Sequence, residues 1–251
     1  MMRLILAGLA CLILCGQAGA AEPAPASVLP ASVDLRPEFE KWGLSPRGQG
    51  ERGTCSVFVT VEALEFVLAR QRGRGQRLSV EYLNWAANQG WGVSRADGSF
   101  FRDCLRGYKY YGICPEEDLP YRDTFDPDLV PSEAAIAKAT EIWAHGFQVR
   151  WIKFWNRQKG LSDGDLVQVK QVLAKGYPVA AGSDHSRLLV GYRDDPRRPG
   201  GGVFIALDSA AVRYTRLDYA WAKANLNDLY WIEGPPAGPE KSAEGRRPRR
   251  G

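Results

Sequence analysis

The stretch Gln49-Gly50-Glu51-Arg52-Gly53-Thr54-Cys55-Ser56-Val57-Phe58 places a glutamine six residues before a cysteine, and an apolar helical pattern begins at that cysteine. The spacing puts the Cys55 thiol at a helix N-terminus and allows the side-chain amide of Gln49 to fold back beside it. Free backbone N–H groups and the positive end of the helix dipole both stabilise a thiolate there. Because the thiolate is the nucleophilic form, we expect Cys55 to be an activated nucleophile.

A nucleophilic cysteine needs a proton acceptor, and the chain contains only two histidines, His145 and His185. His145 has no matching partner in its stretch, so we interpret it as an ordinary loop or strand-edge residue. His185 opens an apolar run that is typical of a buried strand. The next strand-like run ends at Asp208, whose carboxylate can hold one ring nitrogen of His185. The other nitrogen then faces the thiol, as a nucleophile, base and orienting group require.

These residues and a set of ordered landmarks resemble the papain-like cysteine peptidases, over most of the chain from about Ser32 to Ile232. His185 and Asp208 follow Cys55 by 130 and 153 residues. Separations of about 130–150 residues are typical of that family. The other landmarks are Ser32-Val33-Asp34-Leu35-Arg36, Leu78-Ser79 followed by Leu83, Ala96-Asp97-Gly98-Ser99-Phe100, Gly112-Ile113-Cys114-Pro115-Glu116 through Pro120-Tyr121, and Asp184-His185 followed by Leu189-Val190-Gly191-Tyr192.

The resemblance implies an α+β, papain-like two-lobe fold, with a helical lobe, an antiparallel β-sheet lobe and the active site in the cleft between them. We place the helical lobe at about residues 45–125 and the sheet lobe at about 126–234. The leader over residues 21–31 is too short for an inhibitory propeptide. The expected protein is therefore a divergent, bacterial-type member without a propeptide.

Carried over residue by residue, the resemblance implies that Cys55 attacks the scissile carbonyl and that His185 carries the proton. Asp208 would orient His185, while Gln49 and the backbone N–H of Cys55 would bind the oxyanion. Main-chain pairing along an extended substrate suits a polypeptide. The expected substrate-binding residues are Gly98, Ser99, Phe100, Ser183 and Ser186.

The chain also departs from the family pattern around this site. Asp208 stands where the family usually has Asn, and an anion there favours the imidazolium more strongly. Arg187 is unusual in a strand that is otherwise apolar, so we expect it to pair with a carboxylate or to reach the cleft. The remaining departures are Ser56 in place of Trp, Ala210-Ala211 in place of a shielding Trp-Gly, and Arg52 in place of a cysteine usually tied in a disulfide.

Hydrophobic periodicity predicts the elements of both lobes. The main helix begins at Cys55 and ends near Gly73-Arg74-Gly75, with Phe58, Val61 and Leu64 at core-facing spacing. We expect helices over about 55–70, 79–85, 101–111, 132–142 and 165–174, and strands over about 147–154, 178–181, 186–192, 203–207 and 229–232.

The two ends of the chain differ in composition from its body. Residues 1–20 have an arginine, an apolar stretch and an Ala-Gly-Ala cleavage site, which predicts a signal peptide cut after Ala20 and a secreted or periplasmic protein. Residues 21–234 form the peptidase domain, and residues 235–251 read as a disordered basic tail. The formal net charge of +4 lies in these ends, and the neutral body gives no support to nucleic-acid binding.

Cysteine usage agrees with an exported thiol enzyme. Removing the signal leaves Cys55, Cys104 and Cys114. Cys104 and Cys114 lie near the two ends of a helical stretch, so we expect them to form a disulfide and leave Cys55 free. No Cys-x-x-Cys pair or histidine cluster indicates a metal site. We expect no metal, no cofactor, no membrane span and a monomer.

Two other classes of function fit the same residues. The chain could be a catalytically inactive papain-fold binding protein that has kept the constellation and lost turnover. Alternatively, it could be a thiol acyl or amide transferase acting on peptide substrates. The function that we expect is that of a secreted thiol endopeptidase. It differs from a transferase in its product, because hydrolysis releases a free carboxylate.

Overall fold

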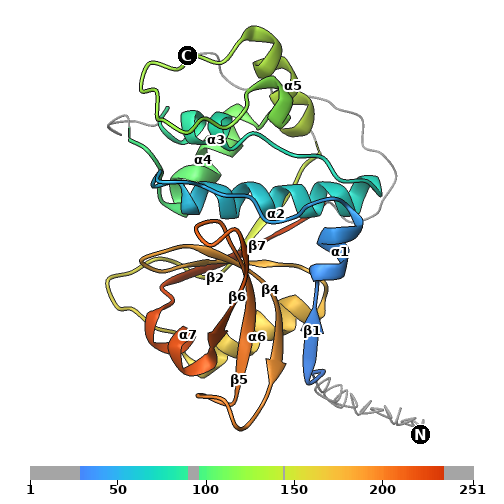
Figure 1. Ribbon diagram of the computed structural model, residues 1–251, viewed down its shortest axis with the longest axis vertical. Helices are drawn as coiled ribbons and strands as arrows, with labels where there is room; N and C mark the ends of the chain where they lie inside the picture. The colour runs from blue at the N-terminus through green and yellow to red at the C-terminus, as the bar shows by residue number, and fades with distance from the viewer. Residues whose placement is uncertain (1–28, 90–95, 144, 235–251) are drawn as a thin grey trace, which may run out of the picture.

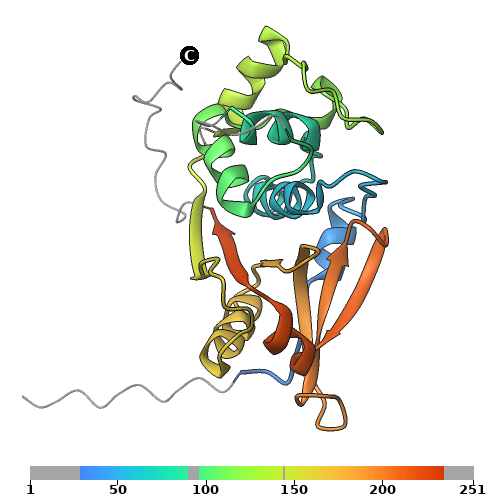
Figure 2. The same ribbon diagram turned by 90° about the vertical axis from the view of Figure 1, so that its left-hand side faces the viewer.

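The computed structural model describes residues 29–89, 96–143 and 145–234, so the predicted signal peptide and basic tail lie outside the described residues. The chain forms a helical half stacked on a sheet half (Figures 1 and 2). This arrangement confirms the predicted α+β two-lobe architecture. The helical half contains α2 (Cys55–Arg72), α3 (Val80–Ala87), α4 (Phe101–Tyr111), the short 3-10 helix η1 (Glu116–Asp118) and α5 (Glu133–Trp143).

The sheet half is one seven-stranded antiparallel sheet with the strand order β2-β7-β3-β4-β5-β6, in which β1 pairs separately with β4. Strand β4 is buried on both faces, and α2 and α6 both pack against it. This double burial explains the nearly continuous apolar run that follows Arg187. The strands are β1 (Ser32–Asp34), β2 (Gln148–Lys153), β3 (Val179–Gly182), β4 (Arg187–Asp194), β5 (Gly202–Asp208), β6 (Arg213–Asp218) and β7 (Asp228–Glu233), and the helices are α1 (Arg36–Lys41), α6 (Asp163–Ala174) and α7 (Tyr219–Asn225).

Helix α2 lies between the two halves and is buried on all sides. Every residue from Ser56 to Ala69 is buried, although the sequence indicates a single core-facing stripe. The helix touches α3 and α4 on one side and β3, β4 and β7 on the other. It ends at Gly73, which adopts the left-handed conformation (φ +68°) that favours glycine at a helix C-terminus. No helix in the described part of the chain is both long and apolar enough to cross a membrane.

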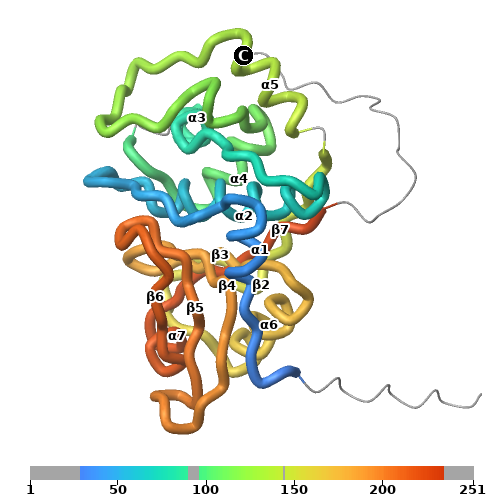
Figure 3. The backbone as a smooth tube through the Cα atoms, turned by 45° about the vertical axis from the view of Figure 1, so that its right-hand side comes forward, coloured from blue at the N-terminus to red at the C-terminus, as the bar shows by residue number. Residues whose placement is uncertain are grey.

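The boundary between the halves differs from the expected division near residue 126. Helix α5 packs on α4 and lies at the top of the helical half (Figure 1). Ala135 and Ala139 of α5 fill a small cluster with Tyr82 and Ala86 of α3. In the other direction, the N-terminal segment begins in the sheet half as β1 and crosses toward α2 through α1 (Figure 3). The chain therefore crosses between the halves before α2 and after α5.

The predicted disulfide is not formed, because Cys104 and Cys114 are both free and buried. Cys104 lies in the first turns of α4 and belongs to the main core, whereas Cys114 packs with Tyr82 beyond the end of that helix. A helix rises about 1.5 Å per residue, so the stretch from Cys104 to Tyr111 carries the chain about 10 Å away. A disulfide spans only about 4.4–6.8 Å between Cα atoms, so one helix separates the two thiols too far.

Two glutamates on α2 are almost completely buried, and they differ in their partners. Glu65 binds Arg47 at 2.8 Å and Arg77 at 3.0 Å and accepts a hydrogen bond from the backbone N–H of Leu78. Neither carboxyl oxygen of Glu62 has a hydrogen-bond partner among the described residues. Burial raises the pKa of Glu62 to about 8. Glu62 is therefore neutral in the folded protein at and below neutral pH.

We expect Glu62→Gln to remove one component of the pH dependence of stability. In the wild type, the unfolded chain releases the Glu62 proton above pH about 4.5, and the folded chain releases it near pH 8. Stability therefore falls as pH rises between these values, by on the order of 3 kcal/mol. Urea unfolding of both proteins at pH 5 and pH 8 measures the effect. Equal pH dependence in the two proteins would contradict this account of Glu62.

Candidate active site

Cys55 is the first residue of α2, and no side chain caps that end of the helix. The preceding residue, Thr54, directs its hydroxyl to the Tyr121 hydroxyl at 2.7 Å instead of to the helix N–H groups. The positive end of the dipole therefore faces the thiol directly. Cys55 is partly exposed, in contrast to the buried Cys104 and Cys114. The structure thus gives Cys55 both the access and the local potential that a nucleophile needs.

His185 and Asp208 meet because β4 and β5 are antiparallel. His185 lies just before the start of β4 and Asp208 ends β5, and the register pairs Leu188 with Leu207. The start of one strand and the end of the next therefore share one edge of the sheet. The Nε2 atom of His185 lies 2.8 Å from Oδ1 of Asp208. This leaves Nδ1 of the ring for the thiol, whose pKa His185 lowers.

The thiol and the imidazole shift each other's titration. Burial alone would raise the pKa of Cys55, but hydrogen bonds from His185 and from the backbone N–H of Ser186 lower it below its usual value. Hydrogen bonds to Asp208 and Cys55 raise the pKa of His185 to about 9. By contrast, burial raises the pKa values of Cys104 and Cys114 to about 12. These shifts favour a thiolate–imidazolium pair at Cys55 and oppose a thiolate at the other two described thiols.

Asp208 is only 3% exposed even though the Trp-Gly shield expected from the family is missing. Its Oδ1 accepts hydrogen bonds from His185 and from the backbone N–H groups of Ala210 and Ala211 at 3.1 and 3.2 Å. Its Oδ2 accepts a hydrogen bond from Nε of Arg187 at 2.7 Å. These donors hold the pKa of Asp208 well below its usual range against the effect of burial. Asp208 is therefore an anion at every pH at which the pair above exists.

Gln49 is buried, and its side-chain amide is fixed at both ends. Its Oε1 accepts a hydrogen bond from the Ser209 hydroxyl at 2.7 Å, and its Nε2 donates to the Arg52 carbonyl at 2.7 Å. The backbone N–H of Gln49 also donates to the Ser209 carbonyl at 3.1 Å. These contacts attach Gln49 to the turn that follows Asp208. The second N–H of the amide makes no hydrogen bond within the described residues, although Gln49 is buried and does not itself line the cleft beside Cys55.

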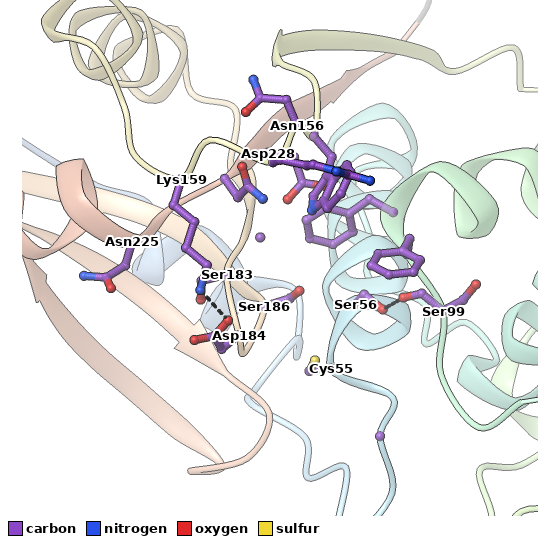
Figure 4. Close-up of a pocket in the computed structure, with 17 residues that line it drawn as sticks. Cys55, Ser56, Ser99, Asn156, Lys159, Ser183, Asp184, Ser186, Asn225 and Asp228 are labelled. Carbon is purple, nitrogen blue, oxygen red and sulfur yellow. Dashed lines mark hydrogen bonds and ion pairs between the residues drawn. The ribbon is translucent and has the colours of Figure 1, made fainter.

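A cleft of about 370 Å³ opens beside Cys55 and is lined by both halves of the molecule. In Figure 4, Ser56 and Ser99 lie on the helical side of Cys55, and Ser183, Asp184 and Ser186 lie on the sheet side. Of the predicted substrate-binding residues, Ser99, Phe100, Ser183 and Ser186 line this cleft and Gly98 does not.

Gly98 lies directly behind the cleft wall. Its φ of +86° favours glycine, and a Cβ there would lie 2.0 Å from the carbonyl oxygen of Gly53. The backbone N–H of Gly98 donates to Oδ1 of Asn84. The Ser56 hydroxyl also donates to the carbonyl of Ser99. Gly98 therefore fixes the segment that presents Ser99 and Phe100 to the cleft.

Asp228 is a cleft residue that sequence reasoning missed. It begins β7, is 6% exposed and lines the cleft together with Gly182 and Phe101. Its Oδ1 lies so close to Gly182 that a Cβ at this glycine would be 1.8 Å away. Burial raises the pKa of Asp228 to about 6. No sequence signal could have identified it, since its place depends on β3 and β7 being neighbours in the sheet.

Arg52, which replaces a family cysteine, forms a buried ionic cluster. Its guanidinium binds Glu81 at 2.6 Å and Asp97 at 2.8 Å and lies 4.6 Å from the centre of the Tyr121 ring. Asp97 precedes Gly98, so this cluster joins the loop before α2 to the wall of the cleft. Ion pairs therefore connect the loop before α2 with α3 and with the wall of the cleft.

We expect Arg52→Met to lower the free energy of unfolding by about 3–5 kcal/mol, because it leaves the charge of Glu81 buried and unpaired. Arg36→Met is the matched control. Arg36 binds Asp34 at 2.6 Å, but both side chains are 39% exposed. Removing such a surface pair costs about 1 kcal/mol or less. Denaturant unfolding of the two variants measures the difference, and similar losses would show that the Arg52 cluster does not stabilise the fold.

The structure is similar to solved cysteine proteases. Xylellain from Xylella fastidiosa matches with a TM-score of 0.64 and 20% sequence identity, covering 83% of this chain and 87% of that one. The proform of the ragweed pollen cysteine protease Amb a 11 matches with a TM-score of 0.61 and 21% identity, covering 84% and 67%. Procathepsin L 3 from Tenebrio molitor larval midgut matches with a TM-score of 0.58 and 20% identity, covering 84% and 72%. No protein-family model and no curated protein sequence matches the chain.

Proposed function

We propose, on the premise that this chain has the fold of papain-like cysteine proteases, that it is a thiol endopeptidase with Cys55 as nucleophile. The observation that carries the proposal is the placement of three groups: Cys55 lines the cleft at the start of α2, His185 lowers the pKa of its thiol, and Nε2 of His185 lies 2.8 Å from Oδ1 of Asp208. Fold alone does not determine activity, so the proposal rests on these groups and their titration.

In the proposed reaction, the Cys55 thiolate attacks the carbonyl carbon of a peptide bond. Negative charge develops on the carbonyl oxygen, which the backbone N–H of Cys55 and the free amide N–H of Gln49 bind. His185 gives its Nδ1 proton to the leaving amine, and a thioester remains on Cys55. His185 then takes a proton from water, which attacks the thioester and releases the carboxylic acid and the thiolate. Asp208 keeps the ring oriented throughout both steps.

A polypeptide is the proposed substrate, because a cleft that is lined by both halves, with Ser99 and Phe100 beside Cys55, can accept an extended chain. Export through residues 1–20 and action as a monomer are parts of the same proposal. The predicted signal lies outside the described residues, so the proposal for export rests on its sequence pattern alone.

Labelling with iodoacetamide tests the nucleophile without a known substrate. We expect Cys55 to be alkylated at pH 6–7, since its pKa is lowered by His185. Cys104 and Cys114 are internal controls, because burial keeps them protonated. Peptide mapping identifies the modified residue. In His185→Ala, labelling of Cys55 should shift to the alkaline pH of an ordinary thiol, and an unchanged pH profile would remove His185 from the site.

Product analysis on an unfolded protein substrate distinguishes hydrolysis from the other two functions. A hydrolase gives new carboxyl termini, a transferase gives a new amide or ester when an amine or alcohol is added, and a binding protein gives neither. Gln49→Ala should lower kcat about 100-fold or more, as loss of one oxyanion donor does. Its Cys55 should still be alkylated at pH 6–7. Unchanged turnover in Gln49→Ala would exclude it from the oxyanion site.

Asp228 makes one wall of the cleft acidic. We expect peptides that place a lysine or arginine there to be cleaved on the order of tenfold faster than norleucine analogues above pH about 6, where the carboxylate is ionised. Asp228→Asn should abolish this preference. Asp184→Asn is the control, because Asp184 lines the same cleft but is exposed and pairs with Lys159. A preference that survives Asp228→Asn would show that Asp228 does not select the substrate.

A further inference from the structure

Arg187 is the one charged residue at the start of the apolar strand β4, and its side chain is directed to the candidate site. Its Nε donates to Oδ2 of Asp208 at 2.7 Å, and its Nη1 donates to the backbone carbonyl of His185 at 3.2 Å. The central guanidinium carbon lies 5.8 Å from the centre of the Trp221 ring. Arg187 therefore contacts both the orienting carboxylate and the backbone of the base that this carboxylate orients.

The two oxygens of Asp208 are divided between the two cationic partners. His185 takes Oδ1 at 2.8 Å, together with two backbone N–H groups. Arg187 takes Oδ2, which the Thr215 hydroxyl also approaches at 3.4 Å. A carboxylate held at both oxygens cannot rotate about its Cβ–Cγ bond without losing a charge-assisted hydrogen bond. Arg187 therefore fixes the plane in which Asp208 meets the imidazole.

The charges matter as much as the geometry. A buried carboxylate with no other cation would hold the imidazole proton very strongly, yet His185 must release that proton to the leaving amine. Asp208 and Cys55 raise the pKa of His185, and the positive charge of Arg187 lowers it. The Arg187–Asp208 pair is close to neutral as a unit, so its effect on the imidazole is nearer to that of a neutral acceptor.

We propose that Arg187 is a positioning residue for the base: it fixes the Asp208 carboxylate from the side opposite His185 and balances its charge, so that the imidazole both stays oriented and can give up its proton. This inference rests on the proposed function for its purpose, but its physical content concerns His185 and can be measured without any substrate.

Other charged groups also face Asp208 and His185. Cys55 faces the imidazole from α2, and Glu62 of the same helix interacts with Asp208 at longer range. Arg213 is the register neighbour of Asp208 on β6, but its side chain is exposed. Within the described residues, Arg187 is the only arginine or lysine that binds the Asp208 carboxylate.

Nuclear magnetic resonance of the histidine rings tests the proposal directly, because the chain has only two histidines. His145 is the internal control, since it contacts Arg72 and Phe147 instead of the candidate site. The titrations are made in a Cys55→Ser background, which removes the coupled thiol. We expect Arg187→Met to raise the pKa of His185 by about half a unit or more. The pKa of His145 should not change.

A second pair of variants gives the same information if Arg187→Met alone does not fold. Asp208→Asn leaves the arginine without its anion and should lower the pKa of His185. Adding Arg187→Met to Asp208→Asn removes this excess charge and should raise the pKa again. Circular dichroism confirms that each variant is folded. A His185 pKa that does not respond to Arg187 in either background overturns the proposal, whether or not the protein is a peptidase.

Kinetics separates positioning from a merely structural role. With Cys55 present and an unfolded protein as substrate, Arg187→Met should lower kcat about tenfold or more with little change in KM. The alkaline limb of its pH profile should move to higher pH. The double variant Arg187→Met with Asp208→Asn should recover part of the lost kcat. A lower melting temperature, together with an unchanged alkaline limb of the pH profile and no recovery of kcat in the double variant, would show that Arg187 only stabilises the fold. If the wild type is inactive but the pKa of His185 still responds to Arg187→Met, the proposed function is contradicted. The role of Arg187 in positioning His185 then remains.

Discussion

The burial of α2 on all sides is the constraint on which the rest of the structure depends. A helix packed between two other helices and a sheet cannot rotate or slide without opening the core. Its first residue is Cys55, so the position of the sulfur is determined by the whole length of the helix. Its N-terminus emerges where the halves meet, and the antiparallel pairing of β4 and β5 brings His185 and Asp208 to the same place. Rigid elements therefore hold each of the three groups.

Ion pairs inside the protein hold the loops and strand ends around the candidate site in place. Arg52 joins the loop before α2 to Asp97, and Arg187 joins the start of β4 to the end of β5. Arginine suits both places because its planar, permanently charged group makes several directed hydrogen bonds at once. Glu62 is the contrast: its carboxyl has no hydrogen-bond partner among the described residues and stays neutral, so its stabilising effect is lost as the pH rises toward 8. Ion pairs thus hold the residues of the site in place. The raised pKa of Glu62 shows how completely the centre of α2 is shielded from water.

The sequence predicted the elements whose pattern is set by burial, and it missed those that are not. Helix α4 has a clear apolar periodicity and strand β4 a nearly continuous apolar run, and both lie where the pattern placed them. Strand β6 has the sequence Arg-Tyr-Thr-Arg-Leu-Asp and lies at the edge of the sheet. Because most of its side chains are polar or partly exposed, no apolar pattern indicated a strand there. The order of Cys55, His185 and Asp208 was visible along the chain. Contacts such as Gln49 with Ser209 and Asp228 with Gly182 were not, because the tertiary fold brings these residues together from distant parts of the chain. The disulfide prediction was wrong because it ignored the length of the helix between the two cysteines.

The three described thiols are all reduced, and only one of them reaches the cleft. A reductant therefore has no disulfide to cleave within the described fold. We expect the fold to be the same under reducing and under non-reducing conditions. A mild oxidant acts differently, because a partly exposed sulfur with a lowered pKa, as at Cys55, is the first to become a sulfenic acid. Such a change would silence the nucleophile while leaving the packing intact, and a small thiol would restore it.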